Sequence, residues 1–455
     1  MATTGVLLGL IILIALAMRG VNVVVAALLG ALVVAVTNAQ PLVEALMEGF
    51  TGSMMGFAGQ FFLIFLAGAI FGRVMGETQA AASVAFALSK RLGAERVLYI
   101  CTIACVVLTY GGVNVFIVIF TVYPLGLSLL QQADLPKRLL LGAVMLGAGT
   151  FTMTALPGTP SLQNVISAQA LGTSLTSGPV IGLIVSALTF GLGMWYLESE
   201  RRRARRRGET FKPAKTDVLP DKEPDARRMP HWSVSLIPLA AVLLTIMGPL
   251  WISGIVYGGD NEDLPALLAF SQAEPMLWTS FAMVVGTLLA ILLFWPFVNQ
   301  PWGIVSRGAE NSVLPLLNTA AVIGFGGVVQ ATEAFQWFAE LMVGSGLHPL
   351  VSAVLSINIV AGIVGSASGG LGIFMETLAP YYLEQGVHAD TLHRIVTIGS
   401  GGLDSLPHSG AVITTLTVMG LTHREAYKDG FIVTVLVPLA SLVLLLTAGL
   451  VLGIW

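Results

Sequence analysis

The feature that most constrains the fold is a polar, glycine-rich segment between two short apolar runs near the C-terminus. The segment, residues 399–410, lies between residues 392–398, which are apolar only after His393 and Arg394, and residues 411–421. A helix needs about 20 apolar residues to cross a bilayer, so neither run spans it alone, whereas the runs and the segment together do. We therefore predict one transmembrane helix that is broken near mid-membrane; a loop in water between two short helices is the alternative.

This break carries groups that can form hydrogen bonds or exchange a proton: Asp404, Ser405, His408 and Ser409. Irregular backbone at such depth is tolerated only where it is buried in protein or lines a cavity, and ionisable groups there are usually functional. Histidine changes charge near neutral pH, and removal from water favours the neutral form of a carboxyl. Our candidates for carrying a coupling proton are Asp404, His408 and Glu376. A neutral histidine bound by backbone groups is the alternative for His408.

The composition is that of a polytopic membrane protein. Of the 455 residues, 55% are hydrophobic and only 10% are charged, whereas about a quarter of a soluble domain is charged. Cys101 and Cys105 lie in an apolar run, so we expect buried thiols rather than a disulfide or a metal site. No metal and no cofactor is expected.

A basic segment, residues 198–231, divides the chain and holds half of its 22 lysines and arginines. Such a cluster beside a membrane helix marks the cytoplasmic side, and we prefer this interpretation to nucleic-acid binding. Counting spans from this linker places the N- and C-termini in the periplasm, and leaves Arg394 as the one basic residue on the outer side. The basic residues of the linker are Arg201, Arg202, Arg203, Arg205, Arg206, Arg207, Lys212, Lys215, Lys222, Arg227 and Arg228.

The two halves of the chain have the same order of elements in opposite orientations. We predict an all-α polytopic membrane protein built from two inverted-topology repeats, each with a re-entrant hairpin and a broken transmembrane helix. The hairpin legs of about 14 residues rise only about 21 Å, which is too short to cross a bilayer. This arrangement is typical of secondary transporters whose site lies at mid-membrane. The first repeat is 1–197, with its hairpin at 97–130 and its broken helix at 139–171; the second is 232–455, with its hairpin at 351–382 and its broken helix at 392–421.

The hairpin tips and helix breaks are our predicted substrate site. A helix that restarts at a break presents unpaired N–H groups, which together with the helix dipole favour an anion. Glycine lets the backbone approach a ligand closely, and hydroxyl and amide side chains suit a carboxylate with its hydroxyl groups. Close helix packing is the alternative reason for small residues here. The predicted substrate-binding residues are Gly111, Gly112, Asn114, Gly158, Thr159, Ser161, Asn164, Ser366, Ser368, Gly369, Gly370, Ser405, His408 and Ser409.

Three motifs resemble those of the gluconate permease (GntP) family of the ion transporter superfamily. They are Tyr110-Gly-Gly-Val-Asn-Val-Phe with Pro124-Leu after it, Pro157-Gly-Thr-Pro, and Ser400-Gly-Gly-Leu-Asp-Ser-Leu-Pro-His. The resemblance covers nearly the whole chain and implies an elevator-type carrier, a homodimer, that takes up sugar acids and small hydroxycarboxylates with protons. The gluconate branch differs at Gly111-Gly and around Pro157, which argues against gluconate itself, and the pattern of the second half better fits a shorter acid such as 3-hydroxybutyrate.

We therefore expect an inner-membrane symporter that takes up a small organic anion, gluconate-like or 3-hydroxybutyrate-like, together with H+. Coupling to Na+ through freed carbonyls and hydroxyls at the same breaks is the alternative. A membrane enzyme is a distant alternative, because Asp404 has no evident acidic partner and neither His-Glu-x-x-His nor a clear Gly-x-Ser-x-Gly motif occurs.

Overall fold

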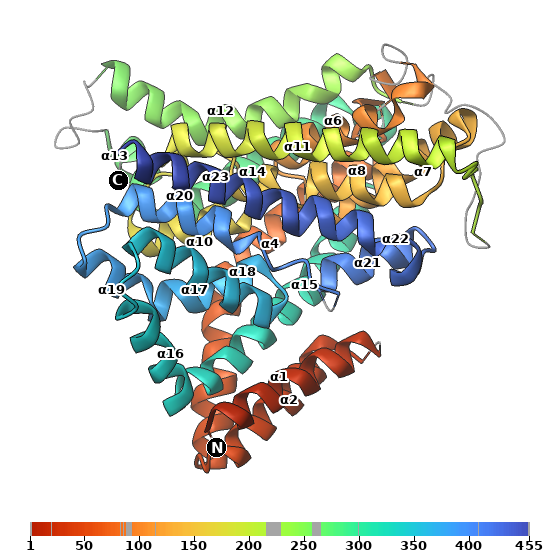
Figure 1. Ribbon diagram of the computed structural model, residues 1–455. Coiled ribbons are helices and arrows are strands. Elements are labelled where there is room, and N and C mark those ends of the chain that lie inside the picture. Colours follow the sequence, from red (N-terminus) through yellow and green to blue (C-terminus); the bar gives the residue numbers. More distant parts are fainter. Residues whose placement is uncertain are drawn as a thin grey trace.

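The computed structural model describes residues 2–19, 21–81, 83–84, 86–87, 93–113, 115–214, 229–256, 265–298, 300–407 and 409–453. Two predicted site residues, Asn114 and His408, lie outside the described residues, as do residues 215–228 of the predicted linker. Every secondary-structure element in the described ranges is a helix (Figure 1). The all-α prediction is therefore confirmed, while the inverted-repeat arrangement stays a prediction.

The helices pack in two groups. In the first helix group, the long helix α15 packs along α4; α2 packs against α15 and α14 against α4, while α1 packs against α2 and α12 against α14. This group consists of α1 (Ala2–Met18), α2 (Val23–Thr37), α4 (Ser53–Glu77), α12 (Trp232–Val256), α14 (Pro275–Leu293) and α15 (Pro301–Gln330). In Figure 1, α1 and α2 form a separate arm at the bottom of the view.

The second helix group contains the two hairpins and the interrupted helices. The first hairpin packs against the first interrupted helix, and the second hairpin packs against both interrupted helices. The members from the first half are α6 (Val97–Tyr110), α7 (Val115–Ala133), α8 (Arg138–Ala148), α9 (Phe151–Thr154), α10 (Leu162–Leu171) and α11 (Pro179–Arg206). Those from the second half are α17 (Pro349–Val364), α18 (Ala367–Thr377), α20 (Ala389–Ser400), α21 (Gly410–Val418), α22 (His423–Phe431) and α23 (Val437–Val451).

The other short helices whose bounds are defined lie mostly where longer helices meet or end. They are α3 (Leu42–Glu44), η1 (Ala45–Gly52), η2 (Ala94–Arg96), α13 (Ala266–Ala273), η4 (Trp295–Phe297), α16 (Glu333–Val343), α19 (Ala379–Glu384) and η5 (Ile432–Leu436).

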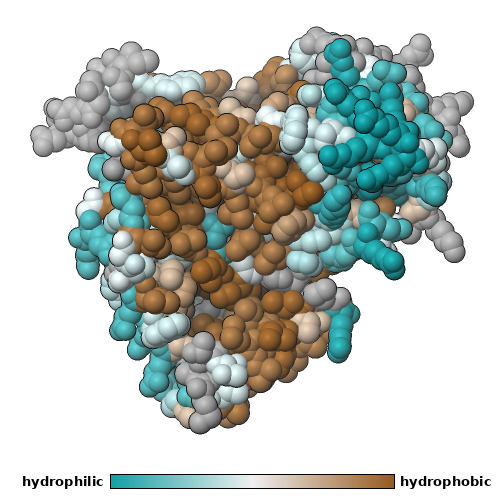
Figure 2. Space-filling view, in the orientation of Figure 1, coloured by the Kyte–Doolittle hydropathy of each residue, from teal (hydrophilic) through white to brown (hydrophobic). Residues whose placement is uncertain are grey.

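Several helices are suited to a bilayer. Among the described residues, five helical stretches are long and apolar enough to cross one: Leu42–Glu77, Pro179–Arg206, Met276–Leu293, Pro301–Gln330 and His423–Val451. In Figure 2, hydrophobic side chains cover a broad band between hydrophilic surfaces at the left edge and at the upper right. These are the features of a multi-pass membrane protein.

Helix α11 continues beyond the predicted start of the linker. It runs through Arg206, so residues 198–206, which we predicted as linker, are helical. Pairs three or four residues apart stabilise this turn of helix: Glu198 binds Arg201, and Glu200 binds Arg203. The basic cluster thus extends a membrane helix rather than beginning a loop.

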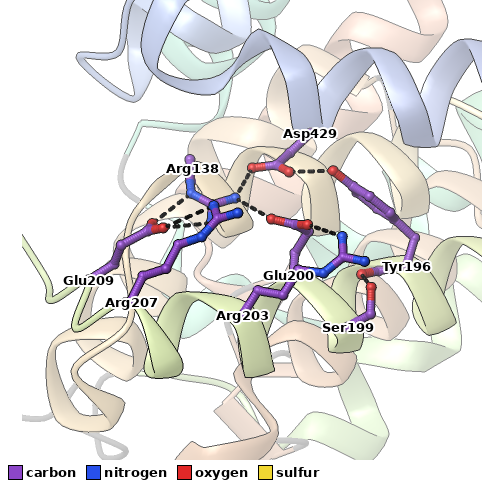
Figure 3. Close-up of polar contacts among 8 residues, drawn as sticks. All are labelled: Arg138, Tyr196, Ser199, Glu200, Arg203, Arg207, Glu209 and Asp429. Carbon is purple, nitrogen blue, oxygen red and sulfur yellow. Dashed lines mark hydrogen bonds and ion pairs between the residues drawn. The ribbon is translucent and has the colours of Figure 1, made fainter.

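A cluster of charges at this end of α11 connects the two halves of the chain (Figure 3). Arg138, at the start of α8, contacts Asp429 of α22 at 2.5 Å, Glu200 of α11 at 3.3 Å and Glu209 at 2.9 Å. The hydroxyl of Tyr196 donates a hydrogen bond to Asp429 at 2.6 Å. We call these five residues the Arg138 cluster. Because Glu200 and Asp429 are buried, the cluster holds α8, α11 and α22 together.

Candidate functional site

A pocket lies where the two helix groups meet. Its cavity volume is about 90 Å³, which is room for several waters or a small organic acid. One wall comes from the first helix group, with Ile64, Phe65, Gly68 and Ala69 of α4 and Met283 of α14. The other wall comes from the tip of the α6–α7 hairpin and the break between α9 and α10, with Thr109, Gly112, Val113, Val115, Met153, Pro160, Ser161 and Leu162.

The hairpin tip and the helix break are joined directly. Tyr110 at the end of α6 donates a hydrogen bond from its hydroxyl to the carbonyl oxygen of Pro157, at 2.9 Å. Gly112 adopts φ +92°, in the left-handed region that favours glycine. A Cβ built on Gly112 would lie 3.3 Å from Pro160. The glycine therefore serves both the turn of the chain and its close approach to the break.

The restart of the helix at α10 opens onto the pocket. Ser161 caps α10 by accepting a hydrogen bond from the backbone N–H of Asn164 at 3.4 Å, and its hydroxyl donates to the carbonyl of Met153. Ser161 and Leu162 both line the pocket. The first N–H groups of a helix lack partners within the helix, and with the helix dipole they favour an anion. This end of the pocket suits a carboxylate.

Thr109 adds a polar group that no other described residue engages. Its side chain is 6% exposed, it lines the pocket, and its hydroxyl has no hydrogen-bond partner within the described part of the chain. A buried polar group without a partner costs about 1–3 kcal/mol, which a ligand with a hydroxyl or carboxylate would recover. Thr109 was not among our predicted site residues; its position directly before the Tyr110-Gly-Gly turn was the available signal.

Asn164, which we predicted to bind substrate, is engaged within the protein. Its amide nitrogen donates to the carbonyls of Thr159 (2.9 Å) and Leu175 (2.8 Å), and its oxygen lies 2.9 Å from Nε2 of His393. Because that oxygen can only accept, Nε2 of His393 carries the proton. The other ring nitrogen of His393 lies 2.6 Å from the hydroxyl of Thr173. This network fixes the first turn of α10.

Three predicted backbone donors are also already paired. The N–H of Gly158 donates to Leu175 at 2.9 Å, and those of Gly369 and Gly370 donate to the side chain (3.3 Å) and carbonyl (2.9 Å) of Ser366. The described lining of the pocket includes Gly112 and Ser161 among the predicted residues, and no residue of the second hairpin or the second break. Substrate binding by the other predicted residues stays a prediction.

The second break places its acid at the tip of the second hairpin. The Asp404 carboxyl accepts a hydrogen bond from the Ser405 hydroxyl at 2.8 Å and interacts with the backbone N–H of Ala367, the first residue of α18. Ser409 and Ser368 are buried nearby in the same half. Glu376, near the end of α18, is exposed, and its role in proton coupling stays a prediction.

Comparison with known proteins identifies the family. The model of the GntP family permeases matches residues 1–451. The chain is 36% identical over 451 residues to the uncharacterized transporter YxjC of Bacillus subtilis (strain 168), covering 95% of each protein. It is 24% identical over 326 residues to the high-affinity gluconate transporter of Escherichia coli (strain K12), covering 69% of this chain and 66% of the relative.

A solved structure supports the fold alone. The Alcanivorax borkumensis YdaH transporter, whose crystal structure is described as having an unusual topology, matches with a TM-score of 0.56 at 16% identity, over 90% of this chain and 89% of that one. The family model and the relatives agree with our expectation of a transporter rather than an enzyme. The protein is a membrane transporter that belongs to the GntP permease family.

Proposed function

We propose that this chain is a secondary active transporter that carries a small organic anion across the inner membrane by proton-coupled symport. The observation that carries the proposal is the pocket between the helix groups, which is lined both by the start of α10 and by Thr109, whose hydroxyl has no hydrogen-bond partner among the described residues. A relative named as a gluconate transporter supports a sugar acid or a short hydroxycarboxylate such as 3-hydroxybutyrate.

The two ends of such a substrate match different groups. The carboxylate binds the first N–H groups of α10 beside Ser161, where the helix dipole stabilises negative charge. A hydroxyl of the substrate bonds Thr109, which recovers the free energy that the unpaired threonine costs. The small pocket volume supports an acid of few carbons. Gly112 gives this substrate close access to the backbone.

The opposite wall supports movement of the second helix group as an elevator. Ile64, Phe65, Ala69 and Met283 are apolar, so the second group can slide along them without breaking polar contacts to the first. In this proposal the second group carries the substrate and the first group is the scaffold. A homodimer joined through the scaffold follows from the family resemblance.

Asp404 is our proposed proton carrier. Its contacts with Ser405 and with Ala367 place it within the second helix group, which is the group that moves. Carrying net charge through a bilayer is costly. Protonation of Asp404 removes one negative charge when the substrate adds one, so the loaded group crosses with the same net charge as the empty one. The charge balance therefore couples one proton to one monoanion.

The orientation of the chain remains part of the proposal. Figure 1 marks the C-terminus at the left of the view and the N-terminus at its bottom, both away from the arginine-rich end of α11 at the right. This arrangement supports a cytoplasmic linker 198–231 and periplasmic termini. Labelling of single introduced cysteines at each end in intact cells, after replacement of Cys101 and Cys105, tests it.

The test of function is uptake of labelled gluconate and 3-hydroxybutyrate into proteoliposomes with an imposed pH or Na+ gradient. We expect an inward proton gradient to drive accumulation. Stimulation of uptake by a Na+ gradient with no response to a pH gradient would show that sodium, not the proton, is the coupling ion. If neither acid is taken up, both are excluded as substrates.

Asp404→Asn separates coupling from binding in the same assay. We expect this variant to lose accumulation against a gradient while it retains exchange of substrate across the membrane. The matched control is Asp390→Asn, an aspartate at the start of α20 whose side chain is 49% exposed, which should leave both activities unchanged. Equal loss of accumulation and exchange in Asp404→Asn would assign the residue to binding or folding instead.

A further inference from the structure

Arg394 is the largest side chain that the second helix group buries completely. It lies in α20 with 0% of its surface exposed. Its guanidinium donates hydrogen bonds to the carbonyls of Ser177 (2.7 Å), Leu175 (3.0 Å) and Ala155 (3.4 Å). All three carbonyls belong to the first half of the chain and flank α10 in sequence. Arg394 therefore fixes both ends of that helical segment from the other half.

These contacts engage all three nitrogens of the Arg394 guanidinium, but they are made to neutral carbonyls and leave its charge without a counter-ion. Within the described ranges, no carboxylate pairs with Arg394. Arg138, the comparable arginine of the first half, is surrounded by three carboxylates. A buried charge without a counter-ion is costly, so proteins rarely retain one without a reason.

The charge lies directly behind the pocket wall. Ala155, one of its acceptors, begins the break whose residues Pro160 and Ser161 line the pocket. A Cβ built on Gly182 would touch both the Arg394 side chain and Pro157, which places the guanidinium stem against the break. The side chains of Arg394 and Tyr110 are close enough to interact electrostatically. Charges in a low-dielectric interior are weakly screened, so a cation behind this wall would stabilise an anion in the pocket.

We propose that Arg394 is the positioning residue that makes the pocket selective for an anion: it holds the break in place and supplies the countercharge that the bound substrate completes. The inference rests on the proposed transport of an organic anion. The positive charge of Arg394 has a counter-ion only when the substrate carboxylate is bound. This accounts for a buried arginine whose contacts in the described ranges are carbonyls.

The neighbouring His393 provides a matched control. It is equally buried and holds the same break through Asn164 and Thr173. His393→Gln disturbs the position of the break without removing the guanidinium. Arg394→Gln removes the charge, and Arg394→Lys keeps the charge while it loses the fork of hydrogen bonds to three carbonyls.

The experiment compares an acid with its neutral amide. Full-length protein in proteoliposomes takes up labelled gluconate, and the inhibition constants of unlabelled gluconate and gluconamide are measured for each variant; 3-hydroxybutyrate and its amide form a second pair. The inhibition constant of the amide divided by that of the acid measures the preference for the charged ligand. This ratio does not depend on the transport rate. We expect Arg394→Gln to lower this ratio by about tenfold or more. Arg394→Lys and His393→Gln should keep the ratio and weaken both inhibitors alike.

Two results would overturn the inference while leaving the proposed function intact. The first is an unchanged ratio in Arg394→Gln. The second is loss of the preference in Arg394→Lys, which also decides the question if the glutamine variant does not fold, as checked by size-exclusion chromatography. Failure of the wild-type protein to take up either acid would instead overturn the proposed function, and the inference with it.

Discussion

Replacement of Arg138 by methionine removes the cation that three acidic side chains share. The arginine side chain is 16% exposed, whereas those of Glu200 and Asp429 are 1% and 2% exposed. Methionine keeps much of the side-chain volume, so the change removes charge and hydrogen bonds more than packing. After the substitution Glu200 keeps Arg203 at 2.7 Å, and Asp429 keeps the hydroxyl of Tyr196.

The expected cost follows from the charge that is left behind. Removing one partner of a buried ion pair costs about 3–5 kcal/mol, because the other charge remains buried without compensation. Asp429 is that charge in Arg138→Met. Arg203→Met removes an arginine that binds the same Glu200, but its side chain is 57% exposed. We expect at most about 1 kcal/mol for this control, as for other exposed pairs.

The assay is the unfolding temperature of the purified full-length protein in one detergent, followed by tryptophan fluorescence. Arg138→Met should unfold at a clearly lower temperature than Arg203→Met. Adding Asp429→Asn to Arg138→Met should restore part of the loss, because it removes the orphaned charge. Equal shifts for the two arginine variants would refute the claim that burial and shared carboxylates make Arg138 the centre of the cluster.

Three further predictions concern the pocket. Thr109→Val should raise the KM for uptake about fivefold, the equivalent of one net hydrogen bond; an unchanged KM would exclude the hydroxyl from binding. Gly112→Ala should reduce uptake, because φ is +92° and the new Cβ would crowd Pro160. The control is Gly346→Ala, at φ +68°, where the new Cβ would have no described non-neighbouring atom within 4 Å. It carries similar backbone strain and should leave uptake normal. Gly68→Phe should fill the pocket and abolish uptake in a protein that still elutes as wild type; normal uptake would place the substrate elsewhere.

The sequence indicated where helices stop because the causes are local. Proline lacks an N–H and glycine weakens helices, so the segments around Pro157 and Pro407 interrupt apolar runs. In the structure no helix covers residues 155–161, and α20 ends at Ser400 while α21 begins at Gly410. The end of α11 was placed too early, because pairs of glutamate and arginine within the basic cluster extend the helix to Arg206.

The same reasoning predicted only part of the candidate site. Gly112 and Ser161 were predicted and line the pocket, but Thr109 and Met283 were not predicted. Met283 lies on a helix far away in sequence, and nothing in the local pattern of α14 says that it faces the first hairpin. The amide of Gly158 was expected to be free, yet Leu175 accepts its hydrogen bond.

Composition and the spacing of glycine and proline by themselves determined a membrane protein of broken helices, because hydrophobic length and backbone hydrogen bonding are properties of neighbouring residues. Only the tertiary structure decided which donors stay unpaired and where charges lie. The charge pattern of the sequence assigned Arg394 to the outer side of the membrane. In the structure it is buried and donates hydrogen bonds to the carbonyls of Ala155 and Ser177. Burial depends on which distant segments pack together, and no local pattern contains that information.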